Sequence, residues 1–306
     1  MQNNKVTVFG GSGFLGSHVS DSLTDAGYQV SIFDVNKSKY IKDGQKMVTG
    51  DITDFNQVNK AIKDSKYVYH FAGIADINKA TKYPIESVKK NILGTTNILE
   101  ACRMQDVERI FFASTIYVYS ELGSFYRSTK QACELLIENY YEEFGLNYTV
   151  LRYGSLYGKR ANDFNFINSA IREALEKGKI TRKGNGEEIR DYINILDAAQ
   201  ASIEVIDHKY INSHIIIKGS QTIKVKDLLS MINEIMGNKI DIQYLKDKHY
   251  KGHYQLTPYA FRPRFAKKYL LKTYYDLGQG LLDSIYDNYK NIYKKNPEKL
   301  FIKNID

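Results

Sequence analysis

Tyrosine–lysine pairs four residues apart are the first feature of this sequence that could do chemistry. On a helix, residues with this spacing share one face, and an ammonium beside a phenol favours the phenolate, which can accept a proton. Three such pairs occur: Tyr126/Lys130, Tyr244/Lys248 and Tyr286/Lys290. A chain with 25 tyrosines yields such pairs by chance, so position along the fold must discriminate among them.

A second group with chemical potential is a glycine-rich segment near the N-terminus. Gly10, Gly13 and Gly16 follow an expected strand and open an expected helix, so their amides can approach a pyrophosphate that bulkier residues would hold away. Asp34 ends the next expected strand, 18 residues after Gly16. A carboxylate there accepts hydrogen bonds from both ribose hydroxyls and repels a 2′-phosphate, which predicts NAD over NADP. Two lysines just beyond could weaken that preference.

Asp51, after the third expected strand, has two interpretations. Its carboxylate could hold the amino group of the adenine, or it could cap the N-terminus of the next helix.

The elements that position these residues alternate between short apolar runs and helical patterns, which is typical of a parallel sheet. Only Tyr126 begins a helix directly after the fifth strand, at the edge of a doubly wound sheet where a nicotinamide would lie. The same strand delivers Ser114 and Thr115, and hence a hydroxyl, to that edge. The six strands are expected at Val6–Phe9, Gln29–Phe33, Lys46–Thr49, Tyr67–Phe71, Arg109–Ser114 and Tyr148–Arg152.

The second half of the chain is less regular and shows no internal repeat. Helices are expected near Phe164–Lys177, Val225–Met236 and Leu281–Tyr293, and a late strand at His214–Lys218. The last helix carries an apolar stripe expected to face a core: Leu282, Ile285, Tyr286, Tyr289, Ile292 and Tyr293. We expect an NAD-binding domain over residues 1–156 with roughly 191–217, interleaved with a smaller substrate domain over residues 157–190 with 218–306.

Composition sets broader limits on function. The 306 residues carry a net charge of +8, which favours acidic ligands such as phosphates, but no basic run points to nucleic acid. Cys102 and Cys133 lie in expected helices, which suggests reduced thiols and no metal framework. His249 and His253 have no third ligand nearby, so no metal is expected. The N-terminal segment indicates neither a signal peptide nor a membrane span, and we expect a cytoplasmic protein.

The spacing Gly-x-x-Gly-x-x-Gly resembles that of the extended short-chain dehydrogenase/reductase family. His70-Phe71-Ala72-Gly73 is similar to the family's His-x-Ala-Ala motif, and residues 91–97 to its Asn-x-x-Gly-Thr motif. Arg190–Asp197 resembles the segment that nucleotide-sugar epimerases place against the substrate diphosphate. The resemblance weakens after about Lys246. It implies an α/β doubly wound (Rossmann) sheet, NAD as cofactor and a nucleoside-diphosphate sugar as substrate.

The resemblance also implies the site residues. Aligned on the family's Ser/Thr-x-x-Val-Tyr-Gly motif, Thr115 is the catalytic hydroxyl beside Tyr126 and Lys130. Tyr126, with its pKa drawn below the free value of about 10 by Lys130 and the nicotinamide ring, would take the sugar hydroxyl proton while NAD accepts the hydride. The cofactor-binding residues expected are Gly10, Gly13, Phe14, Leu15, Gly16, Asp34, Asp51, Ile52, Ala72, Asn91, Ser114, Tyr126 and Lys130. The substrate-binding residues expected are Ser155, Arg160, Arg190 and Arg262, because guanidinium forks suit phosphate oxygens.

The expected reaction is oxidation of a nucleotide-activated sugar at C4, with net 4-epimerisation or net 4-dehydrogenation for surface-polysaccharide synthesis. Ile116 and Tyr117 stand where the family's 4,6-dehydratases carry an acid/base pair, so dehydration is disfavoured. The segment Ile116–Phe125 is shorter than is usual in the family, which predicts an open pocket and makes release of a ketone a close rival to epimerisation.

Two further expectations concern partners. A non-catalytic dinucleotide- or RNA-binding member of the same fold is the alternative, suggested by the Lys- and Tyr-rich stretch Asp247–Tyr275. The family resemblance suggests a homodimer that pairs the helices over Ile85–Met104 and Tyr126–Phe144.

Overall fold

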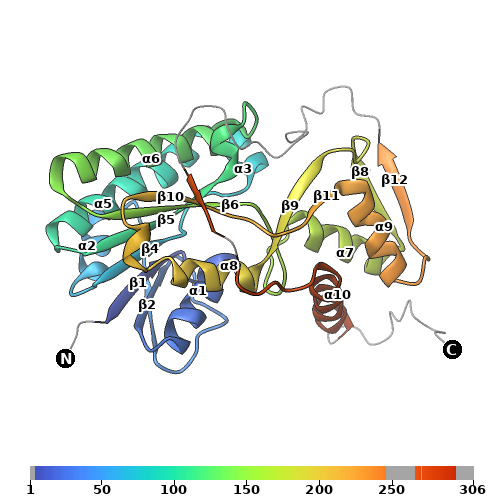
Figure 1. Ribbon diagram of the computed structural model, residues 1–306, viewed down its shortest axis with the longest axis horizontal. Coiled ribbons are helices and arrows are strands. Elements are labelled where there is room, and N and C mark those ends of the chain that lie inside the picture. Colours follow the sequence, from blue (N-terminus) through green and yellow to red (C-terminus); the bar gives the residue numbers. More distant parts are fainter. Residues whose placement is uncertain (1–3, 246–265, 270, 294–306) are drawn as a thin grey trace. The chain divides into compact units, whose positions relative to one another are not determined.

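An eight-stranded sheet organises the first of two compact units in the computed structural model (Figure 1), which describes residues 4–245, 266–269 and 271–293. Its strands are β1 (Lys5–Phe9), β2 (Gln29–Asp34), β3 (Gln45–Thr49), β4 (Tyr67–His70), β5 (Arg109–Thr115), β6 (Tyr148–Tyr153), β10 (Ser213–Ile217) and β13 (Ala266–Lys268). All neighbours pair in parallel, in the order β13-β10-β6-β5-β4-β1-β2-β3. The order reverses between β1 and β4, which is where doubly wound sheets bind ligands.

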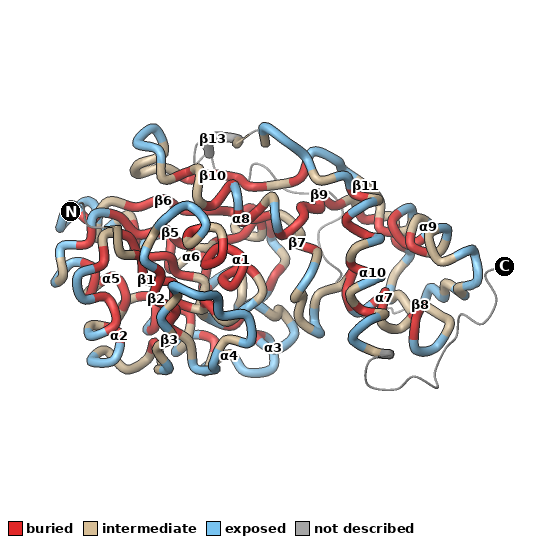
Figure 2. Tube along the Cα trace, turned by 90° about the horizontal axis from the view of Figure 1, so that it is seen from below, coloured by how far each residue is buried: buried red, intermediate tan, exposed pale blue. Residues whose placement is uncertain are grey.

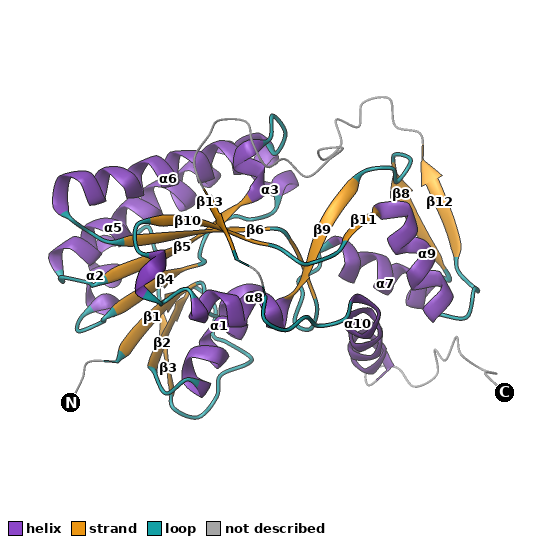
Figure 3. Ribbon diagram, viewed as in Figure 1, coloured by secondary structure: helices purple, strands orange, loops and turns teal. Residues whose placement is uncertain are grey.

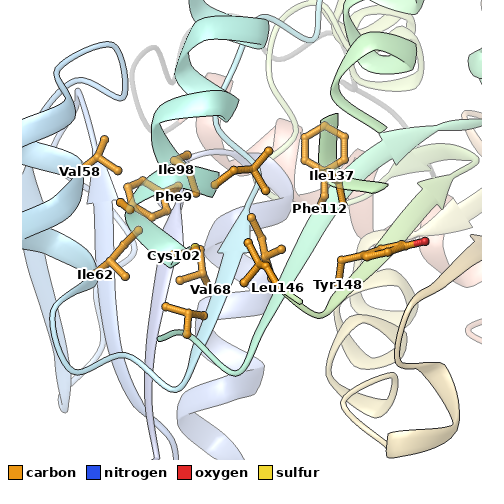
Figure 4. Packing of buried hydrophobic residues seen from close by; sticks show 14 of the residues in the cluster. Phe9, Val58, Ile62, Val68, Ile98, Cys102, Phe112, Ile137, Leu146 and Tyr148 are labelled. Carbon is orange, nitrogen blue, oxygen red and sulfur yellow. The ribbon is translucent and has the colours of Figure 1, made fainter. Parts of the chain in front are cut away.

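Helices cover both faces of this sheet, as Figure 3 shows. The helical elements of this unit are α1 (Phe14–Asp25), α2 (Phe55–Ile62), α3 (Ile77–Lys82), α4 (Pro84–Ser87), η1 (Val88–Leu93), α5 (Gly94–Met104), η2 (Ile116–Tyr119), α6 (Ser124–Phe144), most of α8 (Ile195–Glu204) and η3 (His208–Tyr210). One core packs α2, α5 and α6 against the strands through residues such as Ile62, Ile98 and Ile137, drawn in Figure 4.

The inner strands β4, β5 and β6 are buried along almost their whole length because both faces of the sheet are covered. Figure 2 shows β1, β5, β6 and β10 as largely buried. Arg109 on β5 and Arg152 on β6 are charged exceptions, and both are fully buried. Arg109 donates to the carbonyls of Ile206 at 2.7 Å and Val205 at 3.3 Å.

The second unit has its own sheets and its own core. Strands β7 (Ser155–Tyr157), β9 (Ile189–Asn194) and β11 (Thr222–Lys224) form a three-stranded sheet, and β8 (Lys179–Lys183) pairs with β12 (Asp241–Leu245). Helices α7 (Phe166–Lys177), α9 (Val225–Ile235) and α10 (Leu277–Tyr293) supply most of the core residues.

The units interleave along the chain, but their limits differ from the expected domain limits. We expected residues 191–197 in the first unit. They belong to the second unit, which contains Gly154–Asp197. The physical reason is that β9 pairs with β7 and β11 rather than with the main sheet. Residues 266–268 were expected in the substrate domain. They form β13, which pairs with β10 at the edge of the main sheet.

The buried face of the last helix, α10, differs in part from the predicted apolar stripe. Leu281 is fully buried, whereas Leu282 and Tyr286 expose 49% and 57% of their surface. Ile285, Tyr289 and Ile292 do pack against the core, as predicted.

Further observations bear on the sequence expectations. Cys102 and Cys133 are buried free thiols. Within residues 4–245, 266–269 and 271–293, no helix combines the length and the apolar character needed to span a bilayer. Over the same ranges, no cluster of three or more histidine, cysteine or acidic side chains could hold a metal ion. His249 and His253 lie outside the described residues.

Candidate active site

The glycine turn after β1 leaves no room for a side chain at Gly10 or at Gly16. Gly10 has φ +77°, and a Cβ there would lie 2.5 Å from the backbone nitrogen of Ala72. A Cβ on Gly16 would lie 2.2 Å from the carbonyl oxygen of Gly10. The turn therefore depends on glycine both for its backbone conformation and for its close packing on the segment after β4.

The N-terminus of α1 emerges from this turn without a side-chain cap among the described residues, since Gly13 occupies the N-cap position. The first amides of the helix, at Phe14 and Leu15, are thus available to an anionic group, and the helix dipole favours negative charge there. This arrangement fits a pyrophosphate, as the sequence predicts.

Asp34 ends β2 beside the glycine turn. Its carboxylate accepts hydrogen bonds from the backbone amides of Ser12 at 3.1 Å and Asn36 at 3.0 Å. These two bonds fix the orientation of the carboxylate while leaving acceptor capacity for ribose hydroxyls. A tight glycine turn, an uncapped helix and an oriented acidic residue together fit a dinucleotide with an unmodified ribose.

Asp51 does not cap the next helix, so one of its two interpretations is wrong. Asp54 is the N-cap of α2 and accepts a bond from the amide of Gln57. Asp51 instead accepts bonds from the amide and the hydroxyl of Thr53, both at 2.9 Å, and the amide bond lowers the pKa of Asp51. The adenine contact remains the prediction for this residue. Ile52, beside it, is buried.

Asn91 supports the segment after β4 rather than offering a free amide to a cofactor. Its Oδ1 accepts from the amide of Ile74 at 2.7 Å, and its Nδ2 donates to the Ile74 carbonyl at 3.1 Å and to Thr129 at 2.9 Å. Thr129 in turn donates to the carbonyl of Tyr126 at 3.0 Å. We therefore revise the expected role of Asn91 from cofactor contact to a link between the Ala72 segment and the start of α6.

Thr115 and Tyr126 are brought together at the carboxyl end of β5. The Thr115 side chain hydrogen-bonds the phenol of Tyr126, and its Oγ1 also accepts from the amide of Tyr117 at 3.2 Å. Burial raises the pKa of Tyr126 to about 12, and the bond from Thr115 opposes that rise. Without cofactor, desolvation therefore outweighs the hydrogen bond; the expected lowering of this pKa, which includes the effect of the cationic nicotinamide ring, stays a prediction.

Lys130 lies one helical turn after Tyr126 and is buried. Its ammonium donates to the carbonyl of Ala113 at 2.7 Å and lies 4.5 Å from the ring centroid of Phe112. Burial lowers the pKa of Lys130, and the charges of Cys133 and Glu134 oppose this change. The lysine thus contacts β5 two to three residues before Thr115.

A buried polar network that contacts the residue before Thr115 was not predicted from the sequence. Ser114, expected to contact the cofactor, donates its hydroxyl to Glu134 Oε1 at 2.5 Å. Glu134 on α6 is paired with Arg152 on β6. The available signals were an arginine inside an apolar strand and a glutamate one turn beyond Lys130, since buried charges are almost always paired.

Three of the four expected substrate residues lie in the second unit. Arg190 on β9 is buried and donates to the carbonyl of Ile189 at 2.9 Å. Ser155 begins β7 and pairs with Tyr192, so Ser155 and Arg190 belong to one sheet. Arg160 follows β7 and has a left-handed backbone, with φ +64°. Arg262 lies outside the described residues.

The sheet, the glycine turn and the hydroxyl–phenol–lysine set define a nicotinamide-dinucleotide-dependent enzyme. The sequence pattern of the "NAD dependent epimerase/dehydratase family" matches residues 6–217. The chain therefore belongs to this family, which confirms the resemblance and the predictions of an enzyme and of NAD as its cofactor.

Individual relatives agree with this assignment. The chain is 29% identical to a putative UDP-glucose 4-epimerase of Methanocaldococcus jannaschii, over 79% of this chain and 86% of that protein. It is 28% identical to a UDP-N-acetyl-alpha-D-glucosaminuronate decarboxylase of Bacillus cytotoxicus, over 82% and 86%. A variant of UDP-glucuronic acid 4-epimerase from Bacillus cereus, solved with UDP-4-deoxy-4-fluoro-glucuronic acid and NAD, has a TM-score of 0.83 at 25% identity, covering 94% of this chain and 100% of that one.

Proposed function

We propose that this protein oxidises a nucleoside-diphosphate sugar at C4 and that its net reaction is 4-epimerisation. The observation that carries the proposal is the placement of Thr115 at the carboxyl end of β5 and of Tyr126 one helical turn before Lys130 on α6, with the Lys130 ammonium donating to the Ala113 carbonyl on β5 at 2.7 Å. A hydroxyl, a phenol and an ammonium in this order provide orientation, a proton acceptor and a positive charge.

Each residue has a distinct role in the proposed reaction. Thr115 orients the C4 hydroxyl, and Tyr126 accepts its proton. Lys130 holds the ribose next to the nicotinamide and adds positive charge near the phenol. NAD, when bound, accepts the hydride from C4 and supplies a cationic ring that favours the phenolate. In the second half-reaction the keto group would present its opposite face, C4 would take the hydride back from the reduced cofactor, and Tyr126 would return the proton to the oxygen.

The groups expected to hold the cofactor come from successive strand ends of the main sheet. The amides at Gly13, Phe14 and Leu15 would bind the pyrophosphate, and Asp34 the adenine-side ribose. Asp51 would accept a hydrogen bond from the amino group of the adenine. The lowered pKa of Asp51 keeps its carboxylate ionised at neutral pH. Gly10 and Gly16 serve by letting the turn pack against Ala72 and close on itself.

Support for a sugar nucleotide comes from the family and from charge. The relatives described above are named for UDP-sugars. Arg190 and Arg160 in the second unit carry guanidinium groups suited to a diphosphate, and Ser155 lies in the same sheet as Arg190. We further propose that the product feeds surface-polysaccharide synthesis in the cytoplasm, where the buried thiols Cys102 and Cys133 need no oxidising compartment.

Net 4-dehydrogenation is the second candidate. It is favoured by the short segment Ile116–Phe125, which offers little protein to enclose a keto intermediate. Dehydration is disfavoured because Ile116 and Tyr117 replace an acid/base pair with side chains that are not carboxylates.

The test is an assay of the full chain against UDP-, GDP- and dTDP-sugars, with products identified by mass and NMR. A stereoisomer of unchanged mass supports the epimerase, and a ketone with reduced cofactor supports the dehydrogenase. A protein that binds NAD or RNA yet turns over no sugar nucleotide would match the non-catalytic alternative and overturn the proposal. Tyr126→Phe is the matched inactive control.

A homodimer is also proposed. Apolar side chains are exposed along α4 and η1 and along the neighbouring α6: Ile85 is 84% exposed, and Val88, Leu93 and Leu135 are 45–48% exposed. Burying this surface against a second copy would remove it from water. Sedimentation of the wild type and of an Ile85→Asp variant tests the assembly, and a wild-type monomer would contradict it.

A further inference from the structure

A buried ion pair joins α6 to β6 behind the candidate active site. Glu134 is 2% exposed and Arg152 is 1% exposed. The guanidinium donates twice to the carboxylate, from Nε to Oε1 at 3.0 Å and from Nη2 to Oε2 at 2.6 Å. Burying two charges costs solvation energy that their attraction need not repay, so such a pair is poor evidence of a purely stabilising role.

The contacts of this pair reach both sides of Thr115. Ser114, the residue before it, donates its hydroxyl to Glu134 at 2.5 Å. Tyr119, at the end of the η2 turn that Thr115 begins, accepts a hydrogen bond from Arg152, whose guanidinium lies 4.8 Å from the tyrosine ring centroid. The chain on either side of the catalytic threonine is therefore tied to one buried ion pair.

The pair also acts on the lysine. Glu134 lies one helical turn beyond Lys130 on α6, and its negative charge opposes the lowering of the Lys130 pKa by burial. The other titratable and charged groups around the lysine and the pair are His70 on β4, Cys133 and Glu138 on α6, and His214 on β10. Burial and the charge of Lys130 lower the pKa of His70 well below its usual value, and burial raises the pKa of the Cys133 thiol. Both groups are therefore neutral, and Glu134 is the compensating anion.

We propose that Glu134 and Arg152 are positioning residues for the reaction: their ion pair holds the end of β5 that carries Thr115 against the turn of α6 that carries Tyr126 and Lys130. This inference deepens the proposed function and rests on it. Neither side chain needs to touch the substrate, because the ion pair acts on the position of the catalytic residues through Ser114, Tyr119 and Lys130.

The first test removes the charge while keeping the shape, with Glu134→Gln. Turnover should fall on the order of 10- to 100-fold, because small misplacements of catalytic groups have effects of this size. The pKa of Lys130 should also fall, since the compensating carboxylate is lost. NMR of isotope-labelled lysine side chains measures it without turnover, and the Lys130 signal is assigned by its absence in Lys130→Met.

The second test cuts one contact and leaves both charges in place. Ser114→Ala removes the hydrogen bond between β5 and Glu134 only. Turnover should fall while the pKa of Lys130 stays unchanged. A decrease in kcat with unchanged KM separates loss of positioning from loss of binding.

Loss of folding is controlled with Arg109, which the structure offers as a matched residue. Arg109 is a fully buried arginine at the opposite end of β5, and its guanidinium donates to the backbone carbonyls of Val205, Ile206 and Asp207. Arg109→Lys and Arg152→Lys should both lower the melting temperature, but only Arg152→Lys should lower the turnover of the folded, NAD-bound enzyme. If Glu134→Gln does not fold stably, the double variant Glu134→Gln/Arg152→Met, which removes both charges, takes its place in these measurements.

The outcomes separate this inference from the proposed function. Wild-type turnover and a wild-type Lys130 pKa in the folded Glu134 variants, with wild-type turnover in Ser114→Ala, would overturn the inference alone. If the wild type oxidises no sugar nucleotide, the proposed function fails. In that case a lowered Lys130 pKa in Glu134→Gln still supports the coupling of the ion pair to Lys130, and an unchanged pKa overturns it.

Discussion

The ammonium of Lys130 donates a hydrogen bond to the carbonyl oxygen of Ala113 at 2.7 Å. This contact ties the helix that carries Tyr126 to the strand that ends at Thr115. The threonine, in turn, hydrogen-bonds the phenol. The end of β5 is thus linked both to Lys130, through the Ala113 carbonyl, and to Tyr126, through Thr115.

The ionisation of Tyr126 should therefore depend strongly on the cofactor. Burial raises the pKa of Tyr126 to about 12, so without NAD the phenol should keep its proton as the pH rises through 10, the usual value. Binding of the cationic cofactor should lower this pKa, and sugar oxidation should accelerate with rising pH because the phenolate is the proton acceptor. Phenolate absorbance, compared between wild type and Tyr126→Phe, measures the ionisation. A Tyr126 that ionises below pH 10 without cofactor would contradict the structure.

Tyr126→Phe should remove the proton acceptor and leave NAD binding intact. Loss of one acid/base group slows turnover on the order of 10²- to 10⁴-fold. The controls are Tyr244→Phe and Tyr286→Phe, which alter the two other tyrosine–lysine pairs and should be almost silent. Both control tyrosines are exposed and lie in the second unit. Steady-state kinetics and calorimetry with NAD decide the question, and near-wild-type turnover of Tyr126→Phe would reject the assignment.

Gly10→Ala should destabilise the protein and abolish tight NAD binding. Gly27→Ala is the matched control: both glycines have positive φ, but a Cβ at Gly27 meets no described atom within 4 Å, whereas one at Gly10 would clash with Ala72. Backbone strain alone costs about 1–3 kcal/mol at either site, and the clash adds to it at Gly10. Thermal unfolding with and without NAD should show a larger loss of stability for Gly10→Ala and a loss of NAD-dependent stabilisation for that variant only.

Asp34→Ala should narrow the preference for NAD over NADP. The carboxylate, held by the amides of Ser12 and Asn36, would accept bonds from the ribose of NAD and would confront a 2′-phosphate with like charge. Its removal should weaken NAD binding more than NADP binding. Calorimetric titration with both dinucleotides is the measurement. Tighter binding of NADP by the wild type would exclude this role for Asp34.

A substrate with deuterium at C4 should return its label to the epimeric product. An epimerase gives a stereoisomer of unchanged mass, whereas a dehydrogenase gives a ketone and labelled, reduced cofactor.

The short segment after Thr115 is relevant because α6 holds it in place: Arg127 donates to the carbonyl of Ser120 at 2.9 Å and Gln131 to that of Val118 at 2.8 Å. Gln131→Ala should loosen this segment and increase the fraction of ketone released. An unchanged product ratio would show that the segment does not retain the intermediate.

The first half of the fold was predictable because its strands are buried on both faces and read as apolar runs. The glycine turn and Asp34 were predictable for the same reason, since their chemistry depends on following such strands directly. The fifth strand and the helix after it located Thr115 and Tyr126, which three equivalent tyrosine–lysine spacings alone could not do.

The parts that failed depended on phase or on long-range partners. In α10, apolar residues at neighbouring positions allow two phases, and the sequence alone did not show that Leu281 rather than Leu282 is buried. Asp51 and Asp54 are equally suitable caps by type, and the start of α2 at Phe55 decides between them. Glu134 and Arg152 are 18 residues apart and on different elements, so their pairing follows only from the packing of α6 on the sheet.

The strand β13 has a consequence for biosynthesis. It adds to β10 at the edge of the main sheet, yet it follows more than a hundred residues that begin at Gly154 and largely build the second unit. A ribosome must therefore translate most of the chain before the sheet can receive its last strand. Release of a nascent chain truncated before Ala266 would leave β10 as an unpaired edge, with its amides and carbonyls open to other chains. Premature termination is thus expected to yield aggregation-prone fragments, rather than a smaller protein that retains the dinucleotide-binding half in a complete form.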